Sequence, residues 1–145
     1  MLRNPVWNMI LPPLVLLALL LGGCGDAAPS IPANLVGTRW RLVSYGPASA
    51  PTAALPKPEI TLELAQNGKI SGSAGCNSYF STAIITGEQL QLGPVGNTAA
   101  GCVDQAIAAQ ERAFLDALYE AQTIALVDST LTIGYPAGQL IFTRP

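Results

Sequence analysis

The sequence ISGSAGCNSYF, residues 70–80, is a run of small residues that ends in a cysteine, an asparagine and two aromatic residues. Gly72 and Gly75 permit backbone angles or close approaches that a Cβ atom would block, which indicates a tightly packed strand end. Cys76 follows as an anchor. The only other cysteine downstream is Cys102, in NTAAGCVDQ, just before a segment with helical periodicity. We expect these two cysteines to meet.

The composition excludes several classes of function. The chain has 145 residues, a net charge of -2 and no histidine. The absence of histidine removes the usual Ser-His-Asp and Cys-His forms of nucleophilic catalysis and the commonest zinc sites. Three cysteines, one of them predicted below to be lipidated, cannot build an all-thiolate metal cage. We therefore expect no metal or other cofactor and, without a basic stripe for phosphate contacts, no nucleic-acid partner.

The N-terminal segment has the features of a secretion signal. Arg3 precedes an apolar run from Ile10 to Leu21, which is shorter than the roughly 20 residues that span a bilayer. The run ends in LGGC, which resembles the lipobox of bacterial lipoproteins, where Cys24 would be acylated, with palmitate as the expected lipid, and become the first mature residue. A cleaved signal with an incidental cysteine and a plain membrane anchor are the alternatives.

We predict a lipoprotein signal peptide at residues 1–23, a tether at 24–35 and a folded domain at 36–145. In Gram-negative lipoproteins an aspartate directly after the cysteine favours inner-membrane retention, whereas Asp26 stands one place later here. The resemblance therefore implies an anchor in the outer membrane, facing the periplasm, where disulfides persist.

Alternating apolar residues predict strands along the domain. The expected strands are residues 38–45, 59–64, 69–74, 79–85, 89–92, 123–127, 131–133 and 139–143. Asn67-Gly68 predicts a type I′ hairpin turn, and residues 46–58 are expected to form a long loop. From 104 to 120 the period becomes helical, with Asp104 as N-cap and with Gln110 and Glu111 at the helix surface or capping a neighbouring loop. The predicted fold class is α+β, a small antiparallel β-sheet meander or partial barrel with one inserted, packed α-helix.

The order and spacing of these residues resemble the META domain family, the HslJ-like proteins. The resemblance rests on Thr38, Trp40 and Leu42; Ile60-Thr61-Leu62; the run from Gly68 to Tyr79; Thr98 and Cys102; Gln110-Glu111, Phe114-Leu115 and Leu118; and Leu131 with Leu140-Ile141-Phe142. Departures from the family pattern are Phe80-Ser81 and Ala100-Gly101. The resemblance implies a small antiparallel β fold with a packed helix, found in bacterial envelope proteins linked to stress tolerance, and it implies no catalytic residues.

The candidate site residues each have a structural alternative. For Cys76 and Cys102 we predict a disulfide, worth roughly 3 to 4 kcal/mol in the chain-entropy model, with two buried free thiols as the alternative. A redox-active pair is disfavoured because the chain has no C-x-x-C motif. Asn77 and Tyr79 are candidate binding residues. An asparagine in a turn more often bonds its own backbone, and an aromatic beside it more often packs in the core.

The function predicted from the sequence is that of a non-enzymatic, monomeric lipoprotein that binds an unknown protein or small molecule in envelope maintenance or stress resistance. The alternative is a periplasmic hydrolase inhibitor, for which 46–58 is the long candidate loop, or a small-ligand carrier. An enzyme would need a lysine, tyrosine or carboxylate mechanism, with Lys57 and Lys69 as the amine candidates and Glu59 and Glu63 as a glycosidase-like pair of carboxylates.

Overall fold

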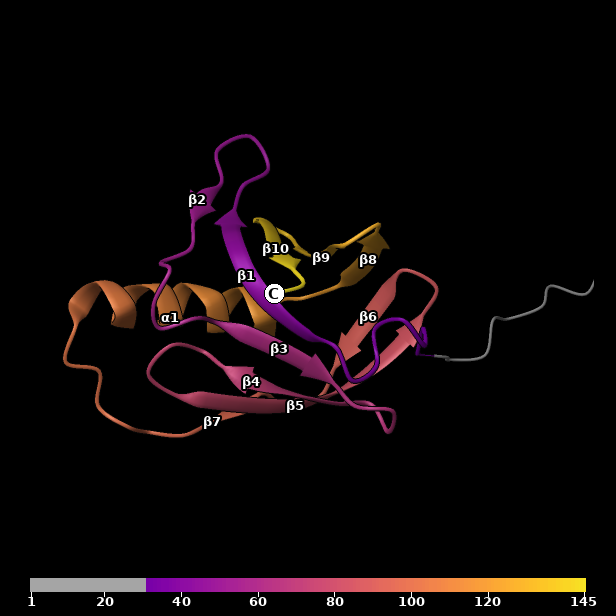
Figure 1. Ribbon diagram of the computed structural model, residues 1–145, viewed down its shortest axis with the longest axis horizontal. Helices are drawn as coiled ribbons and strands as arrows, with labels where there is room; N and C mark the ends of the chain where they lie inside the picture. The colour runs from indigo at the N-terminus through magenta and orange to yellow at the C-terminus, as the bar shows by residue number, and fades with distance from the viewer. Residues whose placement is uncertain (1–30) are drawn as a thin grey trace, which may run out of the picture.

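The computed structural model describes residues 31–145, and its centre is a closed antiparallel barrel of eight strands (Figure 1). The elements are β1 (Arg39–Gly46), β2 (Thr52–Ala53), β3 (Thr61–Leu64), β4 (Lys69–Ser73), β5 (Ser78–Thr86), β6 (Gln89–Leu92), β7 (Gly96–Asn97), α1 (Gln105–Tyr119), β8 (Thr123–Val127), β9 (Thr130–Tyr135) and β10 (Gly138–Thr143). The alternating strands and the helix are confirmed close to their predicted bounds.

The barrel closes in the order β1-β10-β9-β8-β6-β5-β4-β3 and back to β1. Strand β1 pairs with β3 on one side and with β10 on the other, so the two ends of the domain meet. Across the helix insertion β6 meets β8 through the pair Gln89 and Thr123. The expected meander or partial barrel is therefore corrected to a closed one, which gives the edge strands partners for their backbone groups.

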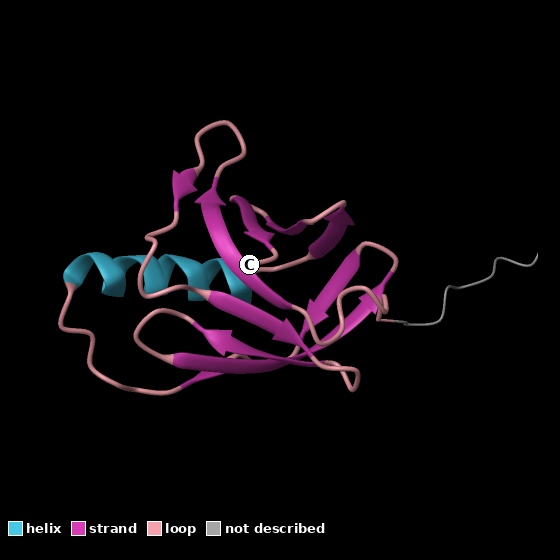
Figure 2. Cartoon of the chain, in the orientation of Figure 1, coloured by secondary structure: helices cyan, strands magenta, loops and turns pink. Residues whose placement is uncertain are grey.

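Helix α1 packs its buried face against the interior of the barrel (Figure 2). Asp104 caps its first turn as predicted, because its side chain accepts hydrogen bonds from the amides of Ala106 and Ile107. The ring of Phe114 meets the rings of Tyr79 and Phe142 edge to face, at centroid distances of 5.2 and 6.4 Å. The helix is thus an integral part of the core.

The barrel interior is filled by large side chains. Trp40, Tyr79, Phe114 and Phe142 are all almost fully buried, together with isoleucine and leucine side chains from the surrounding strands. Eight strands enclose a space just wide enough for side chains to fill. The alternating apolar residues of the strands therefore point into a packed core. The predicted burial of the β1 face that carries Trp40 is confirmed.

The turn between β3 and β4 differs from the predicted type I′ turn. Only Gly68 adopts a positive φ, of 81°, and its amide donates to the carbonyl oxygen of Ala65 at 3.0 Å. The side-chain oxygen of Asn67 accepts a hydrogen bond from the amide of Lys69, and Asn67 itself does not adopt a positive φ. The result is a right-handed turn followed by a left-handed glycine, the usual three-residue hairpin connection.

The expected role of Gly72 is confirmed. A Cβ atom built at Gly72 would lie 1.9 Å from the carbonyl oxygen of Thr61 in the neighbouring strand, so this crossing of β3 and β4 tolerates only glycine. Gly75 has a φ of 121° in the turn that leads to Cys76.

Two segments outside the ring differ from the predicted organisation. Residues 46–58, predicted as a loop, include the short strand β2 paired with β1 and project beyond the barrel (Figure 1). Ile31 and Leu35, from the predicted tether, pack against the core. Cys24 and the signal peptide lie outside the described residues. Within residues 31–145, no helix has the length and apolar character needed to cross a membrane.

Candidate functional site

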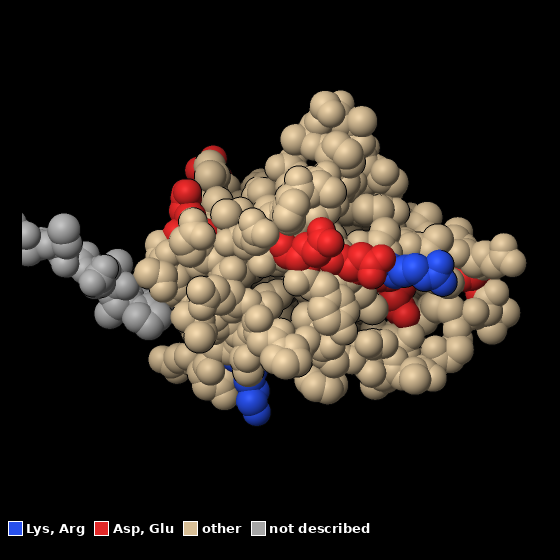
Figure 3. All heavy atoms as spheres, turned by 180° about the vertical axis from the view of Figure 1, so that it is seen from behind, with Lys and Arg blue, Asp and Glu red and all other residues tan. Residues whose placement is uncertain are grey.

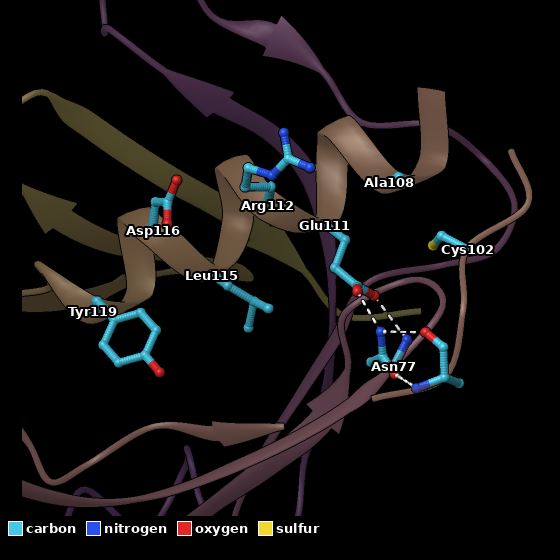
Figure 4. Close-up of a pocket in the computed structure, with 9 residues that line it drawn as sticks. Asn77, Cys102, Ala108, Glu111, Arg112, Leu115, Asp116 and Tyr119 are labelled. Carbon is cyan, nitrogen blue, oxygen red and sulfur yellow. Dashed lines mark hydrogen bonds between the residues drawn. The ribbon is translucent and has the colours of Figure 1, made fainter. Parts of the chain in front are cut away.

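Three of the predicted site residues, Cys76, Asn77 and Cys102, meet where the turn between β4 and β5 contacts α1 and the segment that precedes it (Figure 4). The disulfide between Cys76 and Cys102 is present, with Cα atoms 5.7 Å apart, and it closes a sequence separation of 26 residues. It joins the end of the small-residue run to the approach of the helix. We call this region, made of Cys76, Asn77, Cys102 and Glu111, the helix-turn junction.

Glu111 reaches from α1 into the turn. Its carboxylate accepts hydrogen bonds from the amide of Cys76 at 2.8 Å, the amide of Asn77 at 2.7 Å and the side-chain Nδ2 of Asn77 at 2.6 Å. The residue is only 8% exposed. The expectation that Glu111 lies at the helix surface is wrong, whereas the alternative that it caps a neighbouring loop is confirmed.

Asn77 uses all of its side-chain hydrogen-bonding capacity within the protein. Its Nδ2 group donates to Glu111 and to the carbonyl of Ala100, and its Oδ1 accepts from the Thr98 hydroxyl at 3.0 Å and the Ala100 amide at 2.7 Å. An amide has two donors and two acceptor positions, so each is occupied. Asn77 therefore ties the turn both to α1 and to the segment that follows β7.

Tyr79 points into the core and is 1% exposed. Its hydroxyl donates to the carbonyl oxygen of Thr61 at 2.9 Å, beside the close crossing at Gly72. Burial raises the pKa of the Tyr79 phenol far above its ordinary value, because the surroundings disfavour the charged phenolate. In this structure Tyr79 has no contact with solvent through which a ligand could reach it without rearrangement.

Gln110 links a second loop to the helix. It is 2% exposed, and its Oε1 accepts from the amide of Leu55 at 2.6 Å. Here too the expected surface position is wrong and the capping role is confirmed. Ile107, Gln110, Glu111, Phe114 and Leu118 share one face at i, i+3, i+4, i+7 and i+11. That spacing is the signal that could have placed both polar residues inside.

The helix-turn junction brings together ligand types that could hold a metal ion. The two cysteine sulfurs and a carboxylate oxygen of Glu111 lie within 4.8 Å of one another. The sulfurs are bonded to each other, and thiolates rather than disulfide sulfurs bind metals. Glu111 already accepts three hydrogen bonds. In the disulfide form these residues are therefore structural.

A pocket of about 350 Å³ opens beside the junction, between α1 and the segment near residue 100. Leu115 and Tyr119 line it (Figure 4). The Tyr119 hydroxyl donates a hydrogen bond to the carbonyl oxygen of Val95 at 2.6 Å. The size lies at the low end of small-ligand sites. Arg112 and Asp116 also line it, four residues apart on the helix, and within residues 31–145 they do not form an ion pair.

The charged side chains near α1 give one face of the molecule an acidic band (Figure 3). Asp116 and Glu120 are exposed on this helix, and Arg112 lies beside them. The two carboxylates that a glycosidase-like enzyme would have to use are paired: a Glu63 oxygen lies 3.6 Å from an Arg39 nitrogen, and a Glu59 oxygen lies 3.3 Å from the Lys57 nitrogen. They are held by separate partners on separate segments.

Comparison with known proteins identifies the fold. The family model described as META domain matches residues 33–145. No curated protein matches the chain. A solved structure described as an NMR structure of a protein from Burkholderia xenovorans has 22% identity and a TM-score of 0.62, and the match covers 100% of this chain and 99% of that chain. A second NMR structure has 19% identity and a TM-score of 0.61, covering 79% of this chain and 94% of that chain. At these identities the two structures show a shared fold alone.

Proposed function

The chain belongs to the META domain family, and on that premise we propose that it is a non-enzymatic binding protein of the bacterial envelope, held at a membrane by a lipidated Cys24. It acts as a monomer in envelope maintenance or stress resistance. Its partner is a protein or small molecule that contacts the outside of the barrel.

The observation that carries this proposal is the full engagement of the side chains at the helix-turn junction. The side chains of Glu111 and Asn77 form their hydrogen bonds within the protein, and the two cysteines are joined by a disulfide. A general base or nucleophile must instead be able to reach a substrate atom. The junction supports a rigid scaffold that presents its outer surface to a partner.

The envelope location is supported by two features of the chain. The segment that ends at Cys24 resembles a lipobox, and the disulfide between Cys76 and Cys102 fits an oxidising compartment. Because Asp26 does not directly follow Cys24, the outer membrane, facing the periplasm, is the proposed site of anchoring.

Inhibition of a periplasmic hydrolase is the second candidate function, and the projecting loop favours it. Residues 47–53 are exposed and uncharged, and they extend beyond the barrel (Figure 1). The base of the loop is fixed by the Leu55 amide on Gln110 and by the Ala54 amide on the carbonyl of Val43 at 3.0 Å. A loop held in place before binding loses less conformational entropy when it enters a partner's cleft.

A carrier of small ligands would have to use the outside of the molecule. Trp40, Tyr79 and Phe142 already fill the interior, so no large ligand could enter without displacing the core. The pocket beside Leu115 and Tyr119 is the place for such a ligand.

Capture from membranes followed by binding to the purified partner tests this proposal. The lipidated protein is purified under non-reducing conditions, and co-purifying proteins and small molecules are identified by mass spectrometry. A loop variant, Ala48→Glu with Ala50→Glu, and a pocket variant, Leu115→Glu, are compared with the exposed surface control Gln105→Glu. We expect one stoichiometric partner whose affinity falls in one of the first two variants and not in the control.

Three results would contradict it. Turnover of an ester, phosphate or glycoside substrate by the purified protein would refute the non-enzymatic role. If the loop variant and the pocket variant both bind the partner as tightly as the control does, the two proposed contact surfaces are refuted. Absence of any co-purifying protein or small molecule from stressed and unstressed cells would refute the binding role itself.

A further inference from the structure

The outer face of β5 carries exposed apolar side chains. Phe80 is 60% exposed and Ile84 is 55% exposed, and both point outward on the same strand. A hollow of about 460 Å³ lies beside Phe80, lined also by Pro94, Lys69 and Thr82. Single exposed apolar residues are ordinary, but here two lie on one strand face, with only Thr82 between them, beside an apolar hollow.

This surface continues to the point where the described chain begins. A second hollow, of about 320 Å³, is lined by Ile31, Gly68 and Ile84. Ile31 packs partly against the core, and its Cδ1 atom would lie 3.9 Å from a Cβ at Gly68. Ile31, Phe80, Ile84 and Pro94 are called the apolar strip below.

The length of chain before Ile31 limits where the strip can lie. Seven residue steps separate Cys24 from Ile31, and at 3.3 to 3.6 Å for each step they reach at most about 25 Å. A lipidated Cys24 sits at the bilayer surface. The connection joins the domain at Ile31, beside Ile84, so the Ile84 end of β5 lies where the chain enters the domain from the anchor, and Phe80 follows on the same strand face toward β7.

We propose that the apolar strip rests on the headgroup region of the membrane that carries the lipid anchor, with Phe80 and Ile84 inserted at its surface. This inference rests on the proposed lipidation of Cys24. Aromatic and aliphatic side chains beside a basic residue are the composition of surfaces that lie in a membrane interface. The strip would hold the barrel in one orientation, with the rest of its surface free for the partner.

The basic residue beside the strip fits this orientation. Lys69 is exposed and lines the same hollow as Phe80, so its ammonium group can meet anionic lipid phosphates while its stem lies along the apolar surface. Glu63, on the neighbouring strand, is paired with Arg39. Glu88 lies in the turn after β5, at the border of the strip, and Asp116 and Glu120 belong to α1.

Tryptophan reporters in the lipidated protein test the contact. Phe80→Trp and Ile84→Trp place a fluorescent side chain on the strip, and Val127→Trp places one at another exposed position, 67% exposed at the end of β8. Strands β8 and β9 lie away from β4 and β5 in Figure 1. Each protein is reconstituted in phosphatidylethanolamine and phosphatidylglycerol vesicles that contain a lipid nitroxide quencher, and sedimentation with the vesicles is measured in the same samples.

The wild-type spectrum, which comes from buried Trp40, is subtracted from that of each variant. The expected result is sedimentation of all three variants, with a blue shift and loss of emission of the added tryptophan for Phe80→Trp and Ile84→Trp only. Sedimentation with equal, water-like emission of the added tryptophan in all three would overturn the docking of the strip and leave the lipid anchor intact. Failure to sediment would overturn the anchor and the docking together. A blue shift without vesicles that grows with protein concentration would assign the strip to a second copy of the chain, against the proposal.

Discussion

Replacing Glu111 by glutamine removes a buried charge while keeping the size of the side chain. The carboxylate accepts three hydrogen bonds of 2.6 to 2.8 Å, and the residue is 8% exposed. Bonds to a charged group contribute about 1.5 to 3 kcal/mol each, and an unsatisfied buried donor costs about 1 to 3 kcal/mol. Glutamine keeps one oxygen acceptor, but its amide group would face the donors of the turn.

We therefore expect Glu111→Gln to lower the free energy of unfolding by about 2 to 4 kcal/mol, because the contributions of bonds in one network do not add fully. That is a large part of the 5 to 15 kcal/mol typical of a domain. The assay is urea unfolding of residues 24–145 followed by the fluorescence of Trp40, which is buried and is the only tryptophan of that segment. Glu120→Gln is the matched control, an exposed glutamate at the end of the same helix.

The two variants separate the network from general effects of charge. Surface substitutions usually change the free energy of unfolding by about 0.5 kcal/mol or less. If Glu111→Gln and Glu120→Gln lower this free energy by amounts that agree within about 0.5 kcal/mol, the assignment of Glu111 as the cap of the turn is refuted. Combining Glu111→Gln with Asn77→Ala should cost less than the sum of the two single changes, since both remove the same bond.

Other features of the fold give predictions of comparable size. Reducing the disulfide, or replacing Cys76 and Cys102 jointly by serine, should lower the free energy of unfolding by roughly 3 to 4 kcal/mol. Urea titration with and without reductant measures this, and no change would contradict the stabilising role. Gly72→Ala should destabilise by about 3 kcal/mol or more because of its 1.9 Å clash, whereas Gly101→Ala, with open space around it, should be nearly neutral in thermal unfolding. Tyr79→Phe should cost about 1 kcal/mol for its lost hydrogen bond. Because burial raises the pKa of Tyr79 above its ordinary 10.0, its contribution is full below pH 10 and falls as the pH rises further, so the wild type should lose stability faster than Tyr79→Phe in alkaline urea titrations. Parallel pH profiles would contradict that assignment.

Local patterns were enough to predict most elements of this fold. The alternation at 89–92 and 123–127 coincides with β6 and β8, and the helical period at 104–120 coincides with α1 to within one residue at each end. These patterns arise because one face of each element is buried, and burial is visible in the order of apolar residues. The pairing of Cys76 with Cys102 followed from the cysteine count and the expected compartment.

Pairing between distant strands was not visible in the same way. Closure needs β1 to meet β10 and β6 to meet β8, and alternation shows which face is buried but not which strand lies beside it. The hairpin turn at Asn67-Gly68 was predicted as the wrong type. The hydrogen bond from the Lys69 amide to the Asn67 side chain forms only in the folded hairpin, and the dipeptide alone does not show it. Polar residues such as Glu111 were misplaced because polarity was given more weight than their position on the buried helix face.

The most direct test of the lipid-anchored role is the intact mass of the protein isolated from bacterial membranes without reductant. We predict a chain that begins at Cys24, carries covalent acyl groups and lacks the two hydrogen atoms removed by the disulfide between Cys76 and Cys102. A chain that begins elsewhere, or an unmodified Cys24, would contradict the account of a lipoprotein that holds a META domain at the membrane surface.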